Sequence, residues 1–179
     1  MPMQTPMDLL MHELGDIYDE ENRLLQILPA LASEASNPQI QNAFQQHLRE
    51  TQQQVQNLEQ CFQALGQQPQ RETCAAIQGL KQEHDSFVKE NPSAQVLDMF
   101  DLGAGLKTEY YEMASYQGLI EKCRLMGQQN CAQLLQQNYL QEHAMAQEII
   151  QLSQQLGQQI AGQMTQQGQM GTGYTTPAP

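Results

Sequence analysis

Residues 10–31 read LMHELGDIYDEENRLLQILPAL, and this stretch decides the fold. Its apolar residues recur at intervals of four and three, which places them on one face of an α-helix. The middle of that face is acidic, because Glu21 interrupts an otherwise apolar series: Leu10, Leu14, Ile17, Glu21, Leu24, Leu28 and Leu31. An unpaired carboxylate in an apolar core costs several kcal/mol. The stretch therefore predicts a long helix whose buried face carries one costly polar group.

Three further stretches, 40–58, 102–123 and 131–156, show the same helical spacing of apolar residues. Each also carries ionisable residues on the apolar face or directly beside it: His47, Glu50, Glu109, Glu112 and Glu142. Carboxylates that converge in the middle of a bundle repel one another unless they are protonated, hydrogen-bonded or bound to a cation. The stretches together predict four long helices around a central acidic site.

The breaks between these helices indicate how they are connected. Asn37 with the proline after it, and Gly127, mark two tight turns, because proline favours the start of a helix and glycine its end. The connection over residues 67–93 is long and carries a short additional helix. Two helical hairpins joined by one long crossover are typical of the ferritin-like four-helix bundle. We therefore predict an all-α, ferritin-like bundle over residues 1–158 and a disordered Gln/Gly/Pro-rich tail over residues 159–179.

Composition argues against several classes of partner. The formal net charge is −12 with only eight Lys and Arg residues, which disfavours binding to nucleic acid or to an anionic membrane surface. No run approaches the roughly 18 apolar residues of a membrane span, and the first residues lack the basic and apolar regions of a signal peptide. We expect a cytoplasmic protein. The four cysteines show no zinc-like spacing, so reduced thiols are expected, with one disulfide as the alternative.

The chain resembles a known family in five segments, which read DLLMHELGDIYDEENRLL, NAFQQHLRETQQQV, CAAIQGLKQEH, KTEYYEMASYQGLI and LLQQNYLQEHAMAQ. These segments are spread over residues 8–156 and are similar to the YciE/YciF family of ferritin-like bacterial stress proteins. The resemblance implies a four-helix ferritin-like fold, a homodimer and a cytoplasmic role in stress tolerance.

The resemblance also implies a set of metal ligands. The acidic and histidine positions of the family fall on Glu21, His47, Glu50, Glu109, Glu112 and Glu142, and its acidic residue on the short helix falls on Glu83. Ferritin-like di-iron bundles carry two Glu-x-x-His pairs. Here Glu50 is followed three residues later by Gln53, and Glu142 by Met145. Both pairs are broken, so we expect a degenerate site.

Two functional hypotheses remain open from the sequence. In the first, the acidic residues hold a pair of iron or manganese ions, with His47 as the nitrogen ligand, and the protein handles peroxide or ferrous iron. In the second, the chain is a non-catalytic, dimeric helical stress or interaction protein without bound metal, and its acids are hydrogen-bonded to Tyr or His neighbours. His12, His84 and His143 are predicted to be surface or structural residues. No nucleophile triad or phosphate-binding glycine loop is present, so the sequence leaves open whether the protein is an enzyme.

Overall fold

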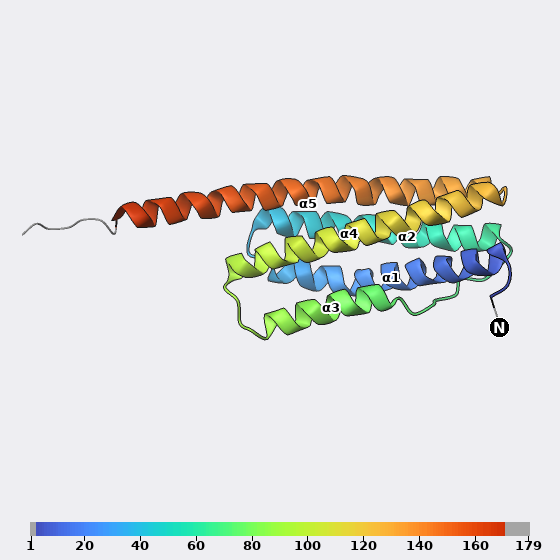
Figure 1. Ribbon diagram of the computed structural model, residues 1–179, viewed down its shortest axis with the longest axis horizontal. Coiled ribbons are helices and arrows are strands. Elements are labelled where there is room, and N and C mark those ends of the chain that lie inside the picture. The colour runs from blue at the N-terminus through green and yellow to red at the C-terminus, as the bar shows by residue number, and fades with distance from the viewer. Residues whose placement is uncertain (1–2, 171–179) are drawn as a thin grey trace, which may run out of the picture.

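The structure is a computed structural model that describes residues 3–170, with side chains described for residues 3–164. Within that range the chain forms helices and no strand, which confirms the predicted all-α class (Figure 1). The helices are α1 (Pro6–Glu34), α2 (Pro38–Ala64), α3 (Ala75–Val88), α4 (Ala94–Leu125) and α5 (Gln129–Met170). None of them combines the length and apolarity needed to cross a bilayer.

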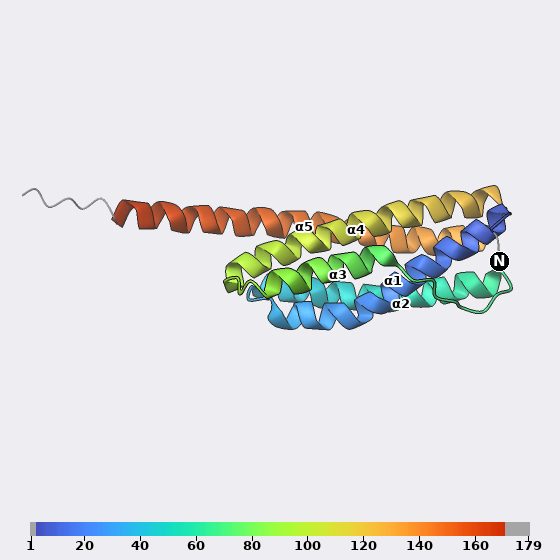
Figure 2. The same cartoon turned by 60° about the horizontal axis from the view of Figure 1, so that its bottom comes forward.

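The four long helices form two hairpins that pack side by side (Figure 1). One hairpin is α1 with α2 and the other is α4 with α5; α2 also contacts α5, and α1 contacts α4. Because α2 and α4 run in the same direction, the chain must return along the bundle between them, and α3 lies in this return (Figures 1 and 2). This is the ferritin-like arrangement expected from the sequence.

The crossover is attached to α1 by specific contacts. Asp19 accepts hydrogen bonds from the Nε of Arg71 at 2.8 Å and from the backbone N–H of Cys74 at 3.0 Å. Four residues earlier, the carbonyl of Gly15 accepts from the backbone N–H of Glu72 at 3.1 Å. A Cβ at Gly15 would lie 2.9 Å from the Cγ of Glu72, so a glycine lets the crossover approach the helix closely. These contacts fix where α3 starts.

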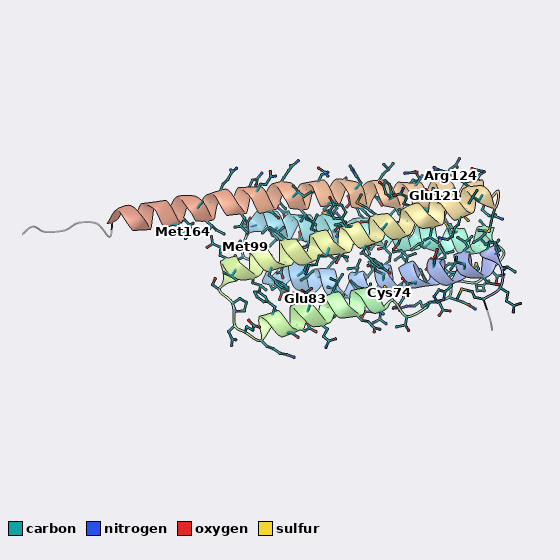
Figure 3. All side chains as sticks on the ribbon, in the orientation of Figure 1. Cys74, Glu83, Met99, Glu121, Arg124 and Met164 are labelled. Carbon is teal, nitrogen blue, oxygen red and sulfur yellow. The ribbon has the colours of Figure 1, made fainter. Side chains whose placement is uncertain are left out.

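The last helix is longer than predicted. We expected it to end near Leu156 and a disordered tail to begin at residue 159, but α5 continues to Met170. Ile160 packs against the apolar core, and Gln163 accepts a hydrogen bond from Gln95 on α4 at 3.5 Å. The final part of α5 extends past the other helices, where Met164 is exposed (Figure 3). Residues 171–179 of the expected tail lie outside the described residues.

Candidate metal centre

The apolar core consists of two separate clusters, one on either side of a buried polar layer. In α1, for example, Ile17 belongs to one cluster and Leu24 to the other, and Glu20 and Glu21 lie between them. The same change occurs in the other three long helices. The buried polar residues of this central layer are Glu20, Glu21, His47, Thr51, Gln54, Asn57, Glu109, Glu112, Asn138 and Glu142.

Four ligand-type side chains meet in the layer: His47, Glu109, Glu112 and Glu142, with one potential ligand atom from each lying within 4.8 Å of the others. The Nδ1 of His47 lies 3.1 Å from an oxygen of Glu109, and its Nε2 lies 3.6 Å from an oxygen of Glu142. None of the four residues is more than 3% exposed. One imidazole and three carboxylates, supplied by α2, α4 and α5, therefore face a common point.

Hydrogen bonding satisfies these acids only in part. The carboxyls of Glu109 and Glu142 share a hydrogen bond and both contact His47, whereas neither carboxylate oxygen of Glu20 or Glu112 has a hydrogen-bond partner among the described residues. A buried polar atom without a partner costs about 1–3 kcal/mol, and more if it is charged. The second hypothesis from the sequence, in which Tyr or His neighbours satisfy the acids, therefore accounts for Glu21 and Glu109 better than for Glu20 and Glu112.

Burial controls the protonation of the layer. It raises the pKa of Glu109, Glu112 and Glu142 well above the usual range for a carboxyl group, and other acids of the layer raise it further for Glu112 and Glu142. Burial also raises the pKa of Glu21 to about 8, against an opposing hydrogen bond from Tyr116. It lowers the pKa of His47 to about 4. Without a cation, the acids hold protons and His47 is neutral, which leaves an imidazole lone pair available for a metal.

Glu21 is the partly satisfied member of the layer. The hydroxyl of Tyr116 donates a short hydrogen bond to its Oε1, while its Oε2 lacks a partner among the described residues. The Tyr116 hydroxyl in turn accepts from the side-chain amide of Asn138 at 3.0 Å. Asn138 also donates to the carbonyl of Gln54 at 3.3 Å and accepts from Asn57 at 2.7 Å. This network connects one acid to α2 and α5, so Glu21 has a structural role in addition to its charge.

Replacing Tyr116 by phenylalanine tests this network. We expect Tyr116→Phe to lower the free energy of unfolding by about 1–3 kcal/mol, because both Glu21 and Asn138 lose a partner in a buried site. Urea denaturation measures the effect. Tyr139→Phe, which removes a hydroxyl from a partly buried tyrosine outside the layer, serves as the control and should change stability much less. Equal effects of the two substitutions would contradict a buried network.

The structure brings together only some of the residues predicted for the site. His47, Glu109, Glu112 and Glu142 form the central group, and Glu21 borders it. Glu50 is half-buried and accepts a hydrogen bond from Gln46 at 3.0 Å, so it lies at the edge. Glu83, an acidic position implied by the resemblance, is on the exposed side of α3 and forms an ion pair with Lys107 at 2.9 Å (Figure 3).

Sequence reasoning missed Glu20. Adjacent helical residues point about 100° apart. If the buried face of the helix is centred on Glu21, the spacing therefore predicts an exposed Glu20. It is fully buried, because Cys74 at the start of α3 and Tyr111 on α4 lie beside it, with 3.6 Å between the thiol and the hydroxyl. The run of three acids over residues 19–21 was the available signal.

A cavity of about 480 Å³ leads to the layer. Its walls come from α1, α2, α3 and α4 and are mainly apolar. The lining includes His47 and Glu109 of the central group. It also includes Glu34 of α1 and His84 and Asp85 of α3. Small molecules or ions could therefore reach the central group between α1, α3 and α4 without separation of the two hairpins.

Comparisons with known proteins agree on one family. The family model described as "Domain of unknown function (DUF892)" matches residues 5–162. Protein YciF of Escherichia coli strain K12 is 32% identical over 145 residues, which are 80% of this chain and 87% of that protein. The crystal structure of the E. coli stress protein YciF matches with a TM-score of 0.83 and 29% identity, over 87% of this chain and 99% of that one. The structure of YcfI from Rhodopseudomonas palustris matches with a TM-score of 0.80 and 35% identity, over 82% of this chain and 94% of that one.

Proposed function

The chain belongs to the DUF892 family of YciF-like stress proteins, and we propose that it binds a pair of iron or manganese ions in the buried acidic layer to handle peroxide or ferrous iron. One observation carries this proposal. His47, Glu109, Glu112 and Glu142 converge on one point, fully buried, and neither carboxylate oxygen of Glu112 has a hydrogen-bond partner among the described residues. Without a ligand, such a cluster leaves buried polar atoms unpaired, which lowers stability.

The donor set fits these metals. Carboxylate oxygens with a single imidazole nitrogen suit divalent manganese and iron better than the thiolate-selecting metals, and no cysteine belongs to the central ligand group. His47, Glu109, Glu112 and Glu142 would hold the first ion, and Glu20 and Glu21 supply further oxygens for a second. When bound, such ions supply Lewis-acid and redox chemistry toward oxygen or peroxide.

The protein's own residues would control access and protons. Two apolar clusters enclose the layer and exclude bulk water, while the cavity beside α3 admits small molecules. The protonated carboxyls must release protons when cations bind, because metal ligands are deprotonated. Metal affinity should therefore rise with pH across the neutral range.

Metal binding can be measured on the full chain. After removal of metal with a chelator, titration with Mn²⁺ followed by electron paramagnetic resonance should show tightly bound ions, and Glu142→Gln should bind fewer of them than the parent. Glu83→Gln is the matched control, since Glu83 is exposed and paired with Lys107, and it should bind Mn²⁺ as the parent does. Equal binding by the parent and Glu142→Gln would overturn the proposal.

The second candidate is the non-catalytic helical protein, and one observation favours it. The layer contains a single histidine, whereas the di-iron pattern of ferritin-like bundles uses two. A metal-free chain that binds neither Mn²⁺ nor Fe²⁺ would support this candidate, in which the bundle holds no metal. The homodimer and the cytoplasmic location implied by the resemblance remain predictions.

A further inference from the structure

A second group of ligand-type side chains lies outside the acidic layer. It consists of Glu34 at the end of α1, His84 on α3 and Asp101 on α4, with potential ligand atoms within 4.8 Å of one another. The Nε2 of His84 is 2.9 Å from an oxygen of Glu34 and 3.3 Å from an oxygen of Asp101. From the sequence we predicted a surface or structural role for His84, and in the structure it lies at the centre of this group.

Asp101 is the least satisfied member of the group. Its side chain is 0% exposed, and neither carboxylate oxygen accepts a hydrogen bond from the described residues. Burial raises the pKa of Asp101 to about 7; His84 opposes this shift, and Glu34 and Asp98 add to it. Asp98 nearby is satisfied, because the backbone N–H and the hydroxyl of Ser36 both donate to it. Asp101 has no such donor and points at the imidazole.

The orientation of His84 suits metal binding. Its Nδ1 lies 3.5 Å from an oxygen of Asp85, which also accepts a hydrogen bond from Lys81 at 2.7 Å. A metal-binding histidine commonly donates its other ring N–H to a carboxylate in this way. With the proton on Nδ1, the Nε2 lone pair faces the oxygens of Glu34 and Asp101, and those three atoms repel one another unless a cation lies between them. Phe100, 6.2 Å from the imidazole between ring centroids, packs beside the ring.

We propose that Glu34, His84 and Asp101 bind one divalent ion of the zinc, manganese and ferrous-iron class, and that Asp85 orients the imidazole. One nitrogen and two carboxylates are a common protein contribution to such a site, with water completing the coordination. His84 is 17% and Glu34 28% exposed at the side chain, so the ion would exchange with solvent readily.

The site would lie on the path to the acidic layer. The cavity of about 480 Å³ is lined by Glu34 and His84, and also by His47 and Glu109. A cation bound at the outer group would therefore share one cavity with the central group. A role in delivering ions inward rests on the proposed function, whereas binding at the outer group does not.

Titration calorimetry with Zn²⁺ on the metal-free full chain tests the outer site. We expect one equivalent of Zn²⁺ to be lost in His84→Ala and in Asp101→Asn, and Asp85→Asn to bind that equivalent about 10–100-fold more weakly. His12→Ala is the matched control, because His12 is exposed and lies 4.0 Å from Glu72 in a surface pair. It should bind as the parent does. Circular dichroism of each variant checks that the helices are retained.

The same titrations test the outer and central sites independently. The outer equivalent should persist in Glu142→Gln, which disables only the central group. An unchanged Zn²⁺ stoichiometry in both His84→Ala and Asp101→Asn would overturn the outer site. Loss of all binding in Glu142→Gln would overturn it as well, while the central site would stand.

Discussion

The metal-free protein is expected to become more stable as the pH falls from 8 to 5. Burial raises the pKa of Glu21 from 4.5 to about 8, and it also raises the pKa of Glu20, Glu109, Glu112 and Glu142 well above the usual carboxyl range. Between pH 4.5 and 8 the folded state therefore binds more protons than the unfolded state, so the free energy of unfolding decreases with increasing pH. For Glu21 alone, the loss between pH 5 and pH 8 is about 4 kcal/mol.

One group of the layer acts in the opposite direction. Burial lowers the pKa of His47 from 6.5 to about 4, so the unfolded state binds a proton that the folded state does not below pH 6.5. This costs about 2 kcal/mol of stability by pH 5, which is less than the gain from Glu21 and its four acidic neighbours. The steepest change should therefore lie between pH 8 and 6.5, where only the acids contribute.

Urea denaturation of chelator-treated protein at pH 8, 6.5 and 5 measures this effect. Glu21→Gln should reduce the dependence on pH, because it removes one group whose pKa is raised. Glu83→Gln, at the exposed ion pair with Lys107, should leave it unchanged. A metal-free protein that is most stable at pH 8 would show that the acids of the layer are ionised and satisfied in the folded state.

The four long helices and the acidic layer could be predicted from the sequence because both are expressed as periodicity. Apolar residues at helical spacing define each buried face, and a carboxylate in that face, such as Glu21 or Glu142, is conspicuous because it breaks the series. The topology followed from the length of the crossover, since a connection between two parallel helices must run the length of the bundle.

Features that depend on contacts between distant segments could not be predicted in this way. Glu20 is buried because the crossover lies over it, and no spacing within α1 reports that contact. The outer group joins Glu34, His84 and Asp101 from three helices, so no motif precedes it. The extension of α5 was missed because the residues after Leu156 show no apolar periodicity and are rich in Gln and Gly. A glycine inside a helix costs only about 1 kcal/mol, and Ile160 packs on the core in this extension.

Adding Mn²⁺ or Fe²⁺ at pH 7.5 is expected to raise the melting temperature substantially. An ion at 100 times its dissociation constant stabilises the folded state by about 2.7 kcal/mol. For a chain of this size, each kcal/mol shifts the midpoint by about 2–4 °C, so one ion should raise it by about 5–10 °C and a pair by more. His84→Ala serves as the background, so that an ion at the outer group does not contribute. Differential scanning fluorimetry with and without metal gives the shift.

Substitution of one central acid should distinguish the two functional hypotheses, because they predict opposite changes in the melting temperature of the metal-free protein. If the layer binds metal, Glu142→Gln abolishes the rise in melting temperature. It also melts above the metal-free parent, because an amide replaces one of several crowded, buried carboxyls. Glu21→Ala should lose much of the rise but melt lower without metal, since Tyr116 loses its acceptor. If the layer is only structural, metal changes neither protein and Glu142→Gln is neutral or destabilised. A parent that does not respond to either ion, together with a less stable Glu142→Gln, would decide for the non-catalytic bundle.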